Sequence, residues 1–144
     1  MSDSGLLHLI KLSVGSESVE SLGEWQRRRF LSDGECWHGT RMMPRRADEL
    51  LDGGSIYWVI QGFIQARQRL VALRPVRRDD GVRAVRFVYD CELVRTELAP
   101  RRAFQGWRYL RDEDAPADLV AGRALEEAGM SLEMRRVLRE AGLL

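Results

Sequence analysis

Twelve consecutive residues, Glu35 to Arg46 (ECWHGTRMMPRR), hold a tryptophan, a histidine and three arginines. An indole ring can stack on a nucleobase, and a guanidinium group grips a phosphate through two parallel hydrogen bonds. These are the two kinds of contact that single-stranded nucleic acid requires. The stretch therefore predicts a ligand-binding surface in the connection between a helix and a sheet.

A second stretch, Pro100 to Leu110 (PRRAFQGWRYL), repeats the combination of arginine and aromatic residues. Because the combination occurs twice in one small chain, we expect the two stretches to form opposite walls of one cleft, with Gly39 and Gly106 letting the backbone approach the ligand. The alternative is that the rings anchor the sheet while the arginines cover its rim with their aliphatic stems. The predicted ligand-binding residues are Trp37, His38, Thr40, Arg41, Arg45, Arg46, Arg101, Gln105, Trp107, Arg108 and Tyr109.

Motifs that identify catalysis with good specificity are absent from the sequence: it has no glycine-rich phosphate loop, no nucleophile elbow and no His-Glu-x-x-His. Of the two histidines, His8 lies in an apolar segment and is expected in the core, whereas His38 is open to a functional role. Cys36 and His38 form a Cys-x-His pair without a second pair at ligand spacing. We expect no metal and no cofactor.

The composition is that of a globular protein, with 144 residues, 44% hydrophobic residues and 31% charged residues. The length predicts a single domain over residues 1–144. No run approaches the roughly 20 apolar residues of a membrane span, and the start of the chain lacks the features of a signal peptide. We expect a cytoplasmic protein in which Cys36 and Cys91 are reduced, buried, small hydrophobic residues. The oligomeric state is left open.

The net charge of +1 creates no strong field, so nucleic acid binding would need a local patch. Lys11 is the only lysine among 23 basic residues, which leaves 22 arginines. Arginine binds phosphate and stacks on aromatic rings better than lysine does. A GC-rich genome that encodes arginine wherever lysine would serve explains the same bias.

Hydrophobic periodicity predicts an α+β fold with a curved, mainly antiparallel sheet of roughly five or six strands, an N-terminal helix and two C-terminal helices. Strands of about 14 residues exceed the usual length, so they must bend or bulge, as in a small barrel. Three arginines, 27 to 29, are placed near the C-terminal end of the first helix, where cations suit the helix dipole. The expected strands are 6–12, 55–61, 63–76, 82–96 and one within 103–110, and the expected helices begin at 19, 45, about 114 and 131.

The run from Thr40 to Ile60, TRMMPRRADELLDGGSIYWVI, resembles a family of bacterial conserved hypothetical proteins of similar length. This resemblance continues through IQARQR and FQGWRYL to the final GLL. The order of strand, helix, arginine-containing connection, short helix ending in Gly-Gly and long meander is also similar to the PUA-like superfamily, which includes ASCH and EVE domains. Those domains carry an acidic residue after the glycine, where this chain has Gly54 and Ser55. The resemblance implies a pseudobarrel with a cleft for RNA or a modified base.

Residues suited to stacking and anion contact outnumber those suited to catalysis, which favours a binding protein over an enzyme. The leading hypothesis is a module that binds RNA or a nucleobase or nucleotide ligand. One alternative is a small amidohydrolase acting on a modified nucleoside, because some ASCH-like proteins use a lysine, a threonine and a glutamate, for which Lys11, Thr40 and Glu92 would stand. The other alternative is a structural or oligomerising protein without a ligand.

Overall fold

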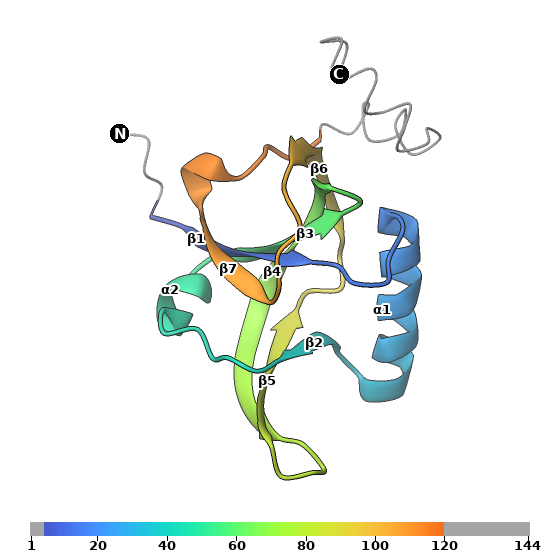
Figure 1. Cartoon of the computed structure of the whole chain (residues 1–144), viewed down its shortest axis with the longest axis vertical. Coiled ribbons are helices and arrows are strands. Elements are labelled where there is room, and N and C mark those ends of the chain that lie inside the picture. Colours follow the sequence, from blue (N-terminus) through green and yellow to red (C-terminus); the bar gives the residue numbers. More distant parts are fainter. Residues whose placement is uncertain (1–4, 120–144) are drawn as a thin grey trace.

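Seven strands form one curled, open, mostly antiparallel sheet in the computed structural model, which describes residues 5–119 (Figure 1). The strands are β1 (Leu7–Leu12), β2 (Cys36–Thr40), β3 (Ser55–Ile60), β4 (Phe63–Arg77), β5 (Arg83–Tyr89), β6 (Val94–Pro100) and β7 (Trp107–Arg111). Their order is β2-β5-β4-β3-β1-β7, with β6 paired to β4, and β1 runs parallel to β3. The predicted curved, mainly antiparallel sheet is confirmed.

Strand β4 is the element around which the sheet curls. Its first half pairs with β3 on one side and β6 on the other, and its second half pairs with β5. The register with β5 shifts between Leu70 and Ala72, so the intervening Val71 is an extra, exposed residue. A bulge of this kind bends a strand and increases its twist. The predicted bending of the long strands is therefore confirmed.

Two strand assignments from the sequence were wrong. Residues 82–96, predicted as one strand, form β5 and β6 with a turn between them, where the Asp90 side chain accepts a hydrogen bond from the Glu92 backbone N–H at 2.9 Å. A hydrogen bond from an aspartate side chain to the backbone two residues further on stabilises a turn, which interrupts the pairing of the strand. The stretch 36–40, predicted as part of a connection, is β2, an edge strand paired with β5 from Cys36 opposite Tyr89 to Thr40 opposite Val85.

The predicted helix near Asp114 also needs correction. Residues Asp112–Asp114 form one 3-10 turn, and the chain then runs along the free edge of β6, with Ala117 O accepting from Glu97 N at 2.9 Å and Leu119 N donating to Arg95 O at 3.0 Å. Unpaired backbone groups at a sheet edge attract such a segment. The rest of this predicted helix and the one beginning at residue 131 lie outside the described residues.

Helix α1 (Val19–Asp33) begins at a reciprocal capping box, in which Ser18 Oγ accepts from Ser21 N at 3.0 Å and Ser21 Oγ accepts from Ser18 N at 3.1 Å. It ends at Gly34, whose φ of 79° places it in the left-handed region. The predicted N-terminal helix is confirmed. Its three arginines are not in the last turn, because the helix continues to Asp33. No helix among residues 5–119 is long and apolar enough to cross a membrane.

The short helix α2 (Ala47–Leu50) is followed by a backbone crossing that only glycine permits. A Cβ atom on Gly54 would lie 2.1 Å from Leu7 O and 2.5 Å from Leu50 O. Glycine therefore lets the start of β3 pass between β1 and α2. The short helix predicted over residues 45–51 is a single turn, Ala47–Leu50, which ends at the cap residue Leu51 before Gly53 and Gly54.

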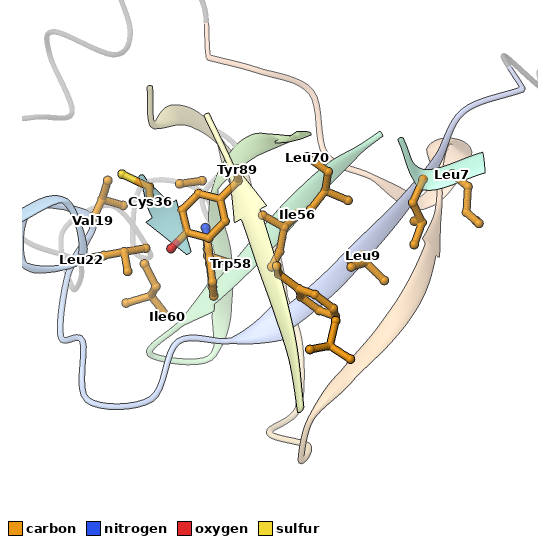
Figure 2. Packing of buried hydrophobic residues seen from close by; sticks show 14 residues of the cluster. Leu7, Leu9, Val19, Leu22, Cys36, Ile56, Trp58, Ile60, Leu70 and Tyr89 are labelled. Carbon is orange, nitrogen blue, oxygen red and sulfur yellow. The ribbon is translucent and has the colours of Figure 1, made fainter. Parts of the chain in front are cut away.

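The main hydrophobic core fills the inner face of the curled sheet, against α1 (Figure 2). Its buried side chains include Leu9, Leu22, Ile56, Trp58, Phe87 and Tyr89. A smaller cluster on the other face contains Ile10, Tyr57, Val59, Ile64 and Leu110. The sheet is thus covered on both faces.

Two buried glutamines tie α1 to the sheet. The amides of Gln26 and Gln68 donate to each other's oxygen atoms at 2.8 and 2.7 Å. Gln68 Oε1 also accepts from Trp58 Nε1 at 2.8 Å, and Gln68 Nε2 also donates to Asp90 O at 2.9 Å. Helix α1, β3, β4 and the end of β5 meet in this network, which satisfies each polar group it contains.

His8 is a core histidine, as predicted. Its Nδ1 accepts from the Ser55 backbone N–H at 3.0 Å, and its Nε2 lies 2.7 Å from Asp112 Oδ1. Since Nδ1 accepts, Nε2 carries the proton that is donated to the carboxylate. The histidine therefore holds the 3-10 turn after β7 against the start of β3.

The cysteines differ from the prediction, because the structure joins Cys36 and Cys91 in a disulfide bond. Cys36 is buried at the start of β2, and Cys91 lies in the exposed loop between β5 and β6. The two positions are 55 residues apart in the sequence, so their pairing depends on the approach of β2 to the end of β5. The bond anchors the edge strand β2 at the end nearest α1.

We predict that reduction of the disulfide lowers the free energy of unfolding by up to about 4 kcal/mol, because the reduced unfolded chain regains the freedom of a long loop. Urea unfolding with and without reductant measures this loss. Thiol titration of the unfolded, unreduced protein should find no free thiol. Two free thiols in that titration would contradict the bond.

Replacement of Gln68 by Leu should lower the free energy of unfolding by roughly 2–4 kcal/mol, because Gln26 and Trp58 would keep buried N–H groups without an acceptor. Urea unfolding followed by circular dichroism measures the change. Gln105→Leu, in the exposed turn before β7, is the matched control and should change stability by less than about 0.5 kcal/mol. Equal effects of the two substitutions would contradict the role of the network.

Candidate functional site

A hollow of about 800 Å³ lies between β2 and the β4–β5 hairpin. Its charged lining consists of Arg41, Arg77, Arg78, Arg86, Asp79 and Asp80. We call it the arginine hollow. Arg78 pairs with Asp80 at 3.2 Å, whereas the guanidinium groups of Arg41 and Arg77 make no hydrogen bond or ion pair within residues 5–119. Arg41, Arg77 and Asp79 are therefore the charged lining residues of this hollow that have no partner within residues 5–119.

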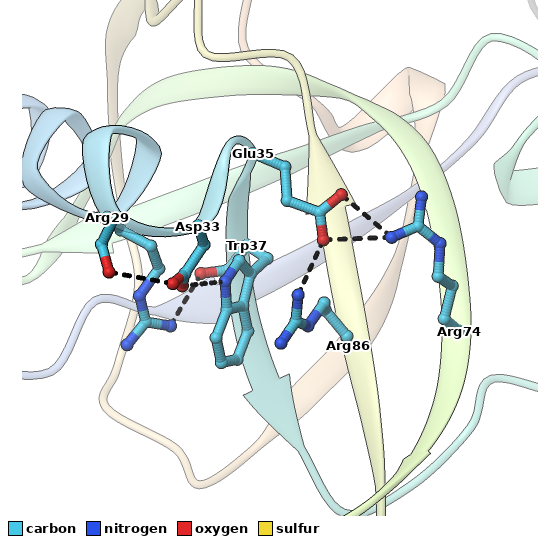
Figure 3. Close-up of polar contacts among 7 residues, drawn as sticks. Arg29, Asp33, Glu35, Trp37, Arg74 and Arg86 are labelled. Atoms are coloured by element: carbon cyan, nitrogen blue, oxygen red, sulfur yellow. Dashed lines mark hydrogen bonds and ion pairs between the residues drawn. The ribbon is translucent and has the colours of Figure 1, made fainter.

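Trp37 forms the end of the arginine hollow next to α1. Its ring stands between two guanidinium groups, with the central carbon of Arg29 at 3.9 Å and that of Arg86 at 3.8 Å from the ring centre (Figure 3). Its Nε1 donates to Asp33 Oδ2 at 2.8 Å. Both ring faces are thus occupied, so Trp37 positions guanidinium groups and offers no free face for a base.

Glu35 partly neutralises the arginines of this surface. It accepts hydrogen bonds from Arg86 Nη1 at 2.8 Å and Arg74 Nη1 at 2.9 Å, and these bonds lower the pKa of its carboxyl group (Figure 3). Arg86 Nε is buried and has no hydrogen-bond acceptor among the described residues. A buried N–H group without an acceptor is energetically unfavourable, so the binding of an additional acceptor beside Arg86 Nε would be favoured.

The two arginine-aromatic stretches do meet, as predicted. Trp107 Nε1 donates to Met42 O at 3.1 Å, and the Arg46 backbone N–H donates to the Tyr109 hydroxyl at 3.1 Å. They line two hollows, however, since Arg41 lies in the arginine hollow and Arg108 in a second one of about 480 Å³ beside β7. We call the second one the β7 hollow.

The other predicted ligand-binding residues are distributed over several places. Thr40 lines the arginine hollow, and Arg101 and Tyr109 line the β7 hollow. Arg46 pairs with Glu49 at 2.6 Å, and the ring of Trp107 packs against the main core. Arg45 and Gln105 are exposed and line neither hollow. Of the two glycines, Gly106 forms a turn with φ 73°, whereas Gly39 borders the arginine hollow.

His38 points to the inner face, away from its neighbour Trp37, because successive side chains of a strand alternate. Its ring lies 4.5 Å from Trp25 and 4.5 Å from Trp58, and its Nδ1 is 2.6 Å from the Tyr89 hydroxyl. Burial, with the nearby charges of Lys11 and Arg29, lowers the pKa of His38 to about 3. The imidazole is therefore neutral at pH 7.

His38 and Lys11 line a third hollow of about 390 Å³, which α1 covers. We call it the lysine hollow. Thr40 and Glu92, the other members of the amidohydrolase alternative, do not line it. Within residues 5–119, no group of three or more His, Cys, Asp or Glu side chains could hold a metal ion.

Several residues of the arginine hollow were missed in the sequence. Arg77, Arg78 and Arg86 lie on the β4–β5 hairpin and were not among the predicted ligand-binding residues. Arg29 was assigned to the helix dipole, yet its guanidinium donates to Trp37 O at 3.1 Å. Alternation within β5 could have indicated that Arg86 faces outward, but nothing local indicates that it meets Trp37.

The profile of one protein family, described as "Protein of unknown function (DUF1489)", matches residues 9–144 of this chain. No curated protein and no solved structure matches it significantly.

The pKa of His38 predicts a specific pH dependence. Between about pH 6.5 and pH 3 the unfolded chain binds a proton at this histidine that the folded chain does not bind, so stability falls as the pH falls. From pH 7 to pH 4, the free energy of unfolding of the wild type should fall by about 3 kcal/mol more than that of His38→Gln. Urea unfolding at both pH values measures the difference, and parallel losses would contradict a neutral, buried His38.

Proposed function

The chain belongs to the DUF1489 family of proteins of unknown function, and we propose that it is a binding module that holds phosphate groups of single-stranded RNA or of a nucleotide in the arginine hollow. The observation that carries the proposal is the presence of Arg41 and Arg77 in one hollow without a hydrogen-bond or ion-pair partner among residues 5–119. Guanidinium groups pair with phosphate through two parallel hydrogen bonds.

The charge of the hollow supports an anionic ligand. Four arginines and two aspartates line it, and Asp80 is already paired with Arg78. The arginines come from three places: the segment after β2, the end of β4 and the middle of β5. A ligand with several phosphates, or a polynucleotide backbone, could reach more than one of them.

The β7 hollow suits the base or sugar part of such a ligand. Tyr109 is exposed there, and the guanidinium carbon of Arg108 lies 4.9 Å from the centre of the Phe104 ring. Aromatic rings and guanidinium planes both stack on bases. The curled sheet is compatible with the PUA-like relationship. This relationship, RNA binding and a cytoplasmic location all stay predictions.

The amidohydrolase alternative gains no support from the geometry. Lys11 lines the lysine hollow and Thr40 lines the arginine hollow. Glu92 lies in the exposed loop between β5 and β6, where its charge acts on Arg67. Binding without this hydrolytic set is the function that the contacts favour.

Replacement of Arg41 or Arg77 by Ala should weaken binding of a short single-stranded RNA by about 1–3 kcal/mol each and make the affinity less dependent on salt. Stability should stay within about 0.5 kcal/mol of the wild type, because neither guanidinium has a hydrogen-bond or ion-pair partner among residues 5–119. Fluorescence anisotropy with a labelled uridine decamer, at several salt concentrations, measures the affinity.

Arg69→Ala is the matched control, since Arg69 is exposed on β4 and lines none of the hollows. It removes the same charge and should leave the affinity almost unchanged. An equal loss in this control would mean that only net charge matters. A wild type that binds neither the RNA nor a nucleoside triphosphate at low salt would refute the proposed function.

A further inference from the structure

The lysine hollow lies under the N-terminal half of α1 and is distinct from the surfaces assigned to nucleic acid. It is lined by Lys11 from β1, by Leu22, Trp25 and Arg28 from α1, and by His38 from β2. Its volume of about 390 Å³ gives room for a small molecule. Apolar and polar groups therefore converge on one small, partly enclosed volume.

Lys11 is the only lysine of the chain and lines this hollow together with one carboxylate, Glu24. Its ammonium group makes no hydrogen bond or ion pair with any residue of the described part of the chain. Burial lowers the pKa of Lys11. A lowered pKa increases the fraction of the amine that is neutral, and the neutral amine is the nucleophilic form.

His38 supplies a second polar atom to the same hollow. Its Nδ1 lies 2.6 Å from the Tyr89 hydroxyl, and the ring also has a hydrogen bond with the backbone of Trp37. The charge of Lys11 is close enough to contribute to the lowered pKa of this histidine. The His38 ring can therefore contact a ligand that contacts Lys11.

We propose that Lys11 is the reactive amine of a small-molecule site that condenses with the aldehyde or ketone group of a small oxo acid. The amine nitrogen attacks the carbonyl carbon, and the carbon–oxygen bond then breaks as a carbon–nitrogen double bond forms. Both hydrogens of the amine leave with the oxygen as water, so no oxidant or reductant is needed. The product is an imine between Lys11 and the ligand.

Other lining residues fit the remaining parts of such a ligand. Arg28 has no ion pair within residues 5–119 and provides a permanent cation for the acid group. The side chains of Leu22 and Trp25 form the apolar wall. Glu24 also lines the hollow, so the ligand must place its carboxylate toward Arg28 and away from Glu24.

The test uses the full chain carrying Arg69→Lys, which adds one exposed lysine outside the hollow as an internal reference. The protein is incubated at pH 7 with glyoxylate and cyanoborohydride, which reduces an imine to a stable amine. Peptide mass spectrometry then gives the modification rates at Lys11, at position 69 and at the N-terminal amine. We expect Lys11 to react several-fold faster than the lysine at position 69.

Two further variants, made in the Arg69→Lys background, distinguish a ligand-binding site from a lysine that is only chemically reactive. The substitution His38→Gln should slow the modification of Lys11 without changing the modification rate of the lysine at position 69. The substitution Arg28→Ala should reduce the preference of Lys11 for glyoxylate over the uncharged acetaldehyde. Reaction at Lys11 no faster than at position 69, or an unchanged preference in Arg28→Ala, would overturn the proposal. These outcomes are independent of RNA binding by the arginine hollow.

Discussion

The buried pair of Gln26 and Gln68 is the interaction on which the two candidate sites depend, because it determines where α1 lies on the sheet. Amides buried without partners destabilise a core, so the helix has one position in which all these groups are satisfied. In that position α1 places Arg29 against Trp37 on the outside and Trp25 against His38 on the inside. A shift of the helix would disrupt both arrangements.

Strand alternation in β2 then separates two kinds of chemistry that are adjacent in the sequence. Trp37 faces outward, where solvent screens the arginines around it and several of them can gather. His38 faces inward, where burial keeps its ring neutral. One short edge strand therefore contributes to an open, charged surface and to a small, enclosed hollow, and the disulfide at Cys36 holds that strand in place.

The use of basic residues follows the same division. The outer surface has arginines, whose charge persists in any environment and whose planar groups pack on Trp37 and pair with Glu35. The lysine hollow has Arg28 and the single lysine, Lys11, whose protonation responds to burial. Arg41 and Arg77 remain available to a ligand because neither guanidinium group pairs with a carboxylate of residues 5–119.

The sequence by itself determined the features that depend on neighbours a few positions away: the cap at Ser18, the short helix before Gly53 and Gly54, the alternation of β4 and the core position of His8. It also marked the two arginine-aromatic stretches that meet. Only the tertiary structure decided that residues 36–40 form a strand, that the stretches line separate hollows, and that Cys36 bonds to Cys91 across 55 positions. Local patterns cannot carry this information, because the pairing partners are distant in the chain and become neighbours only when the sheet curls.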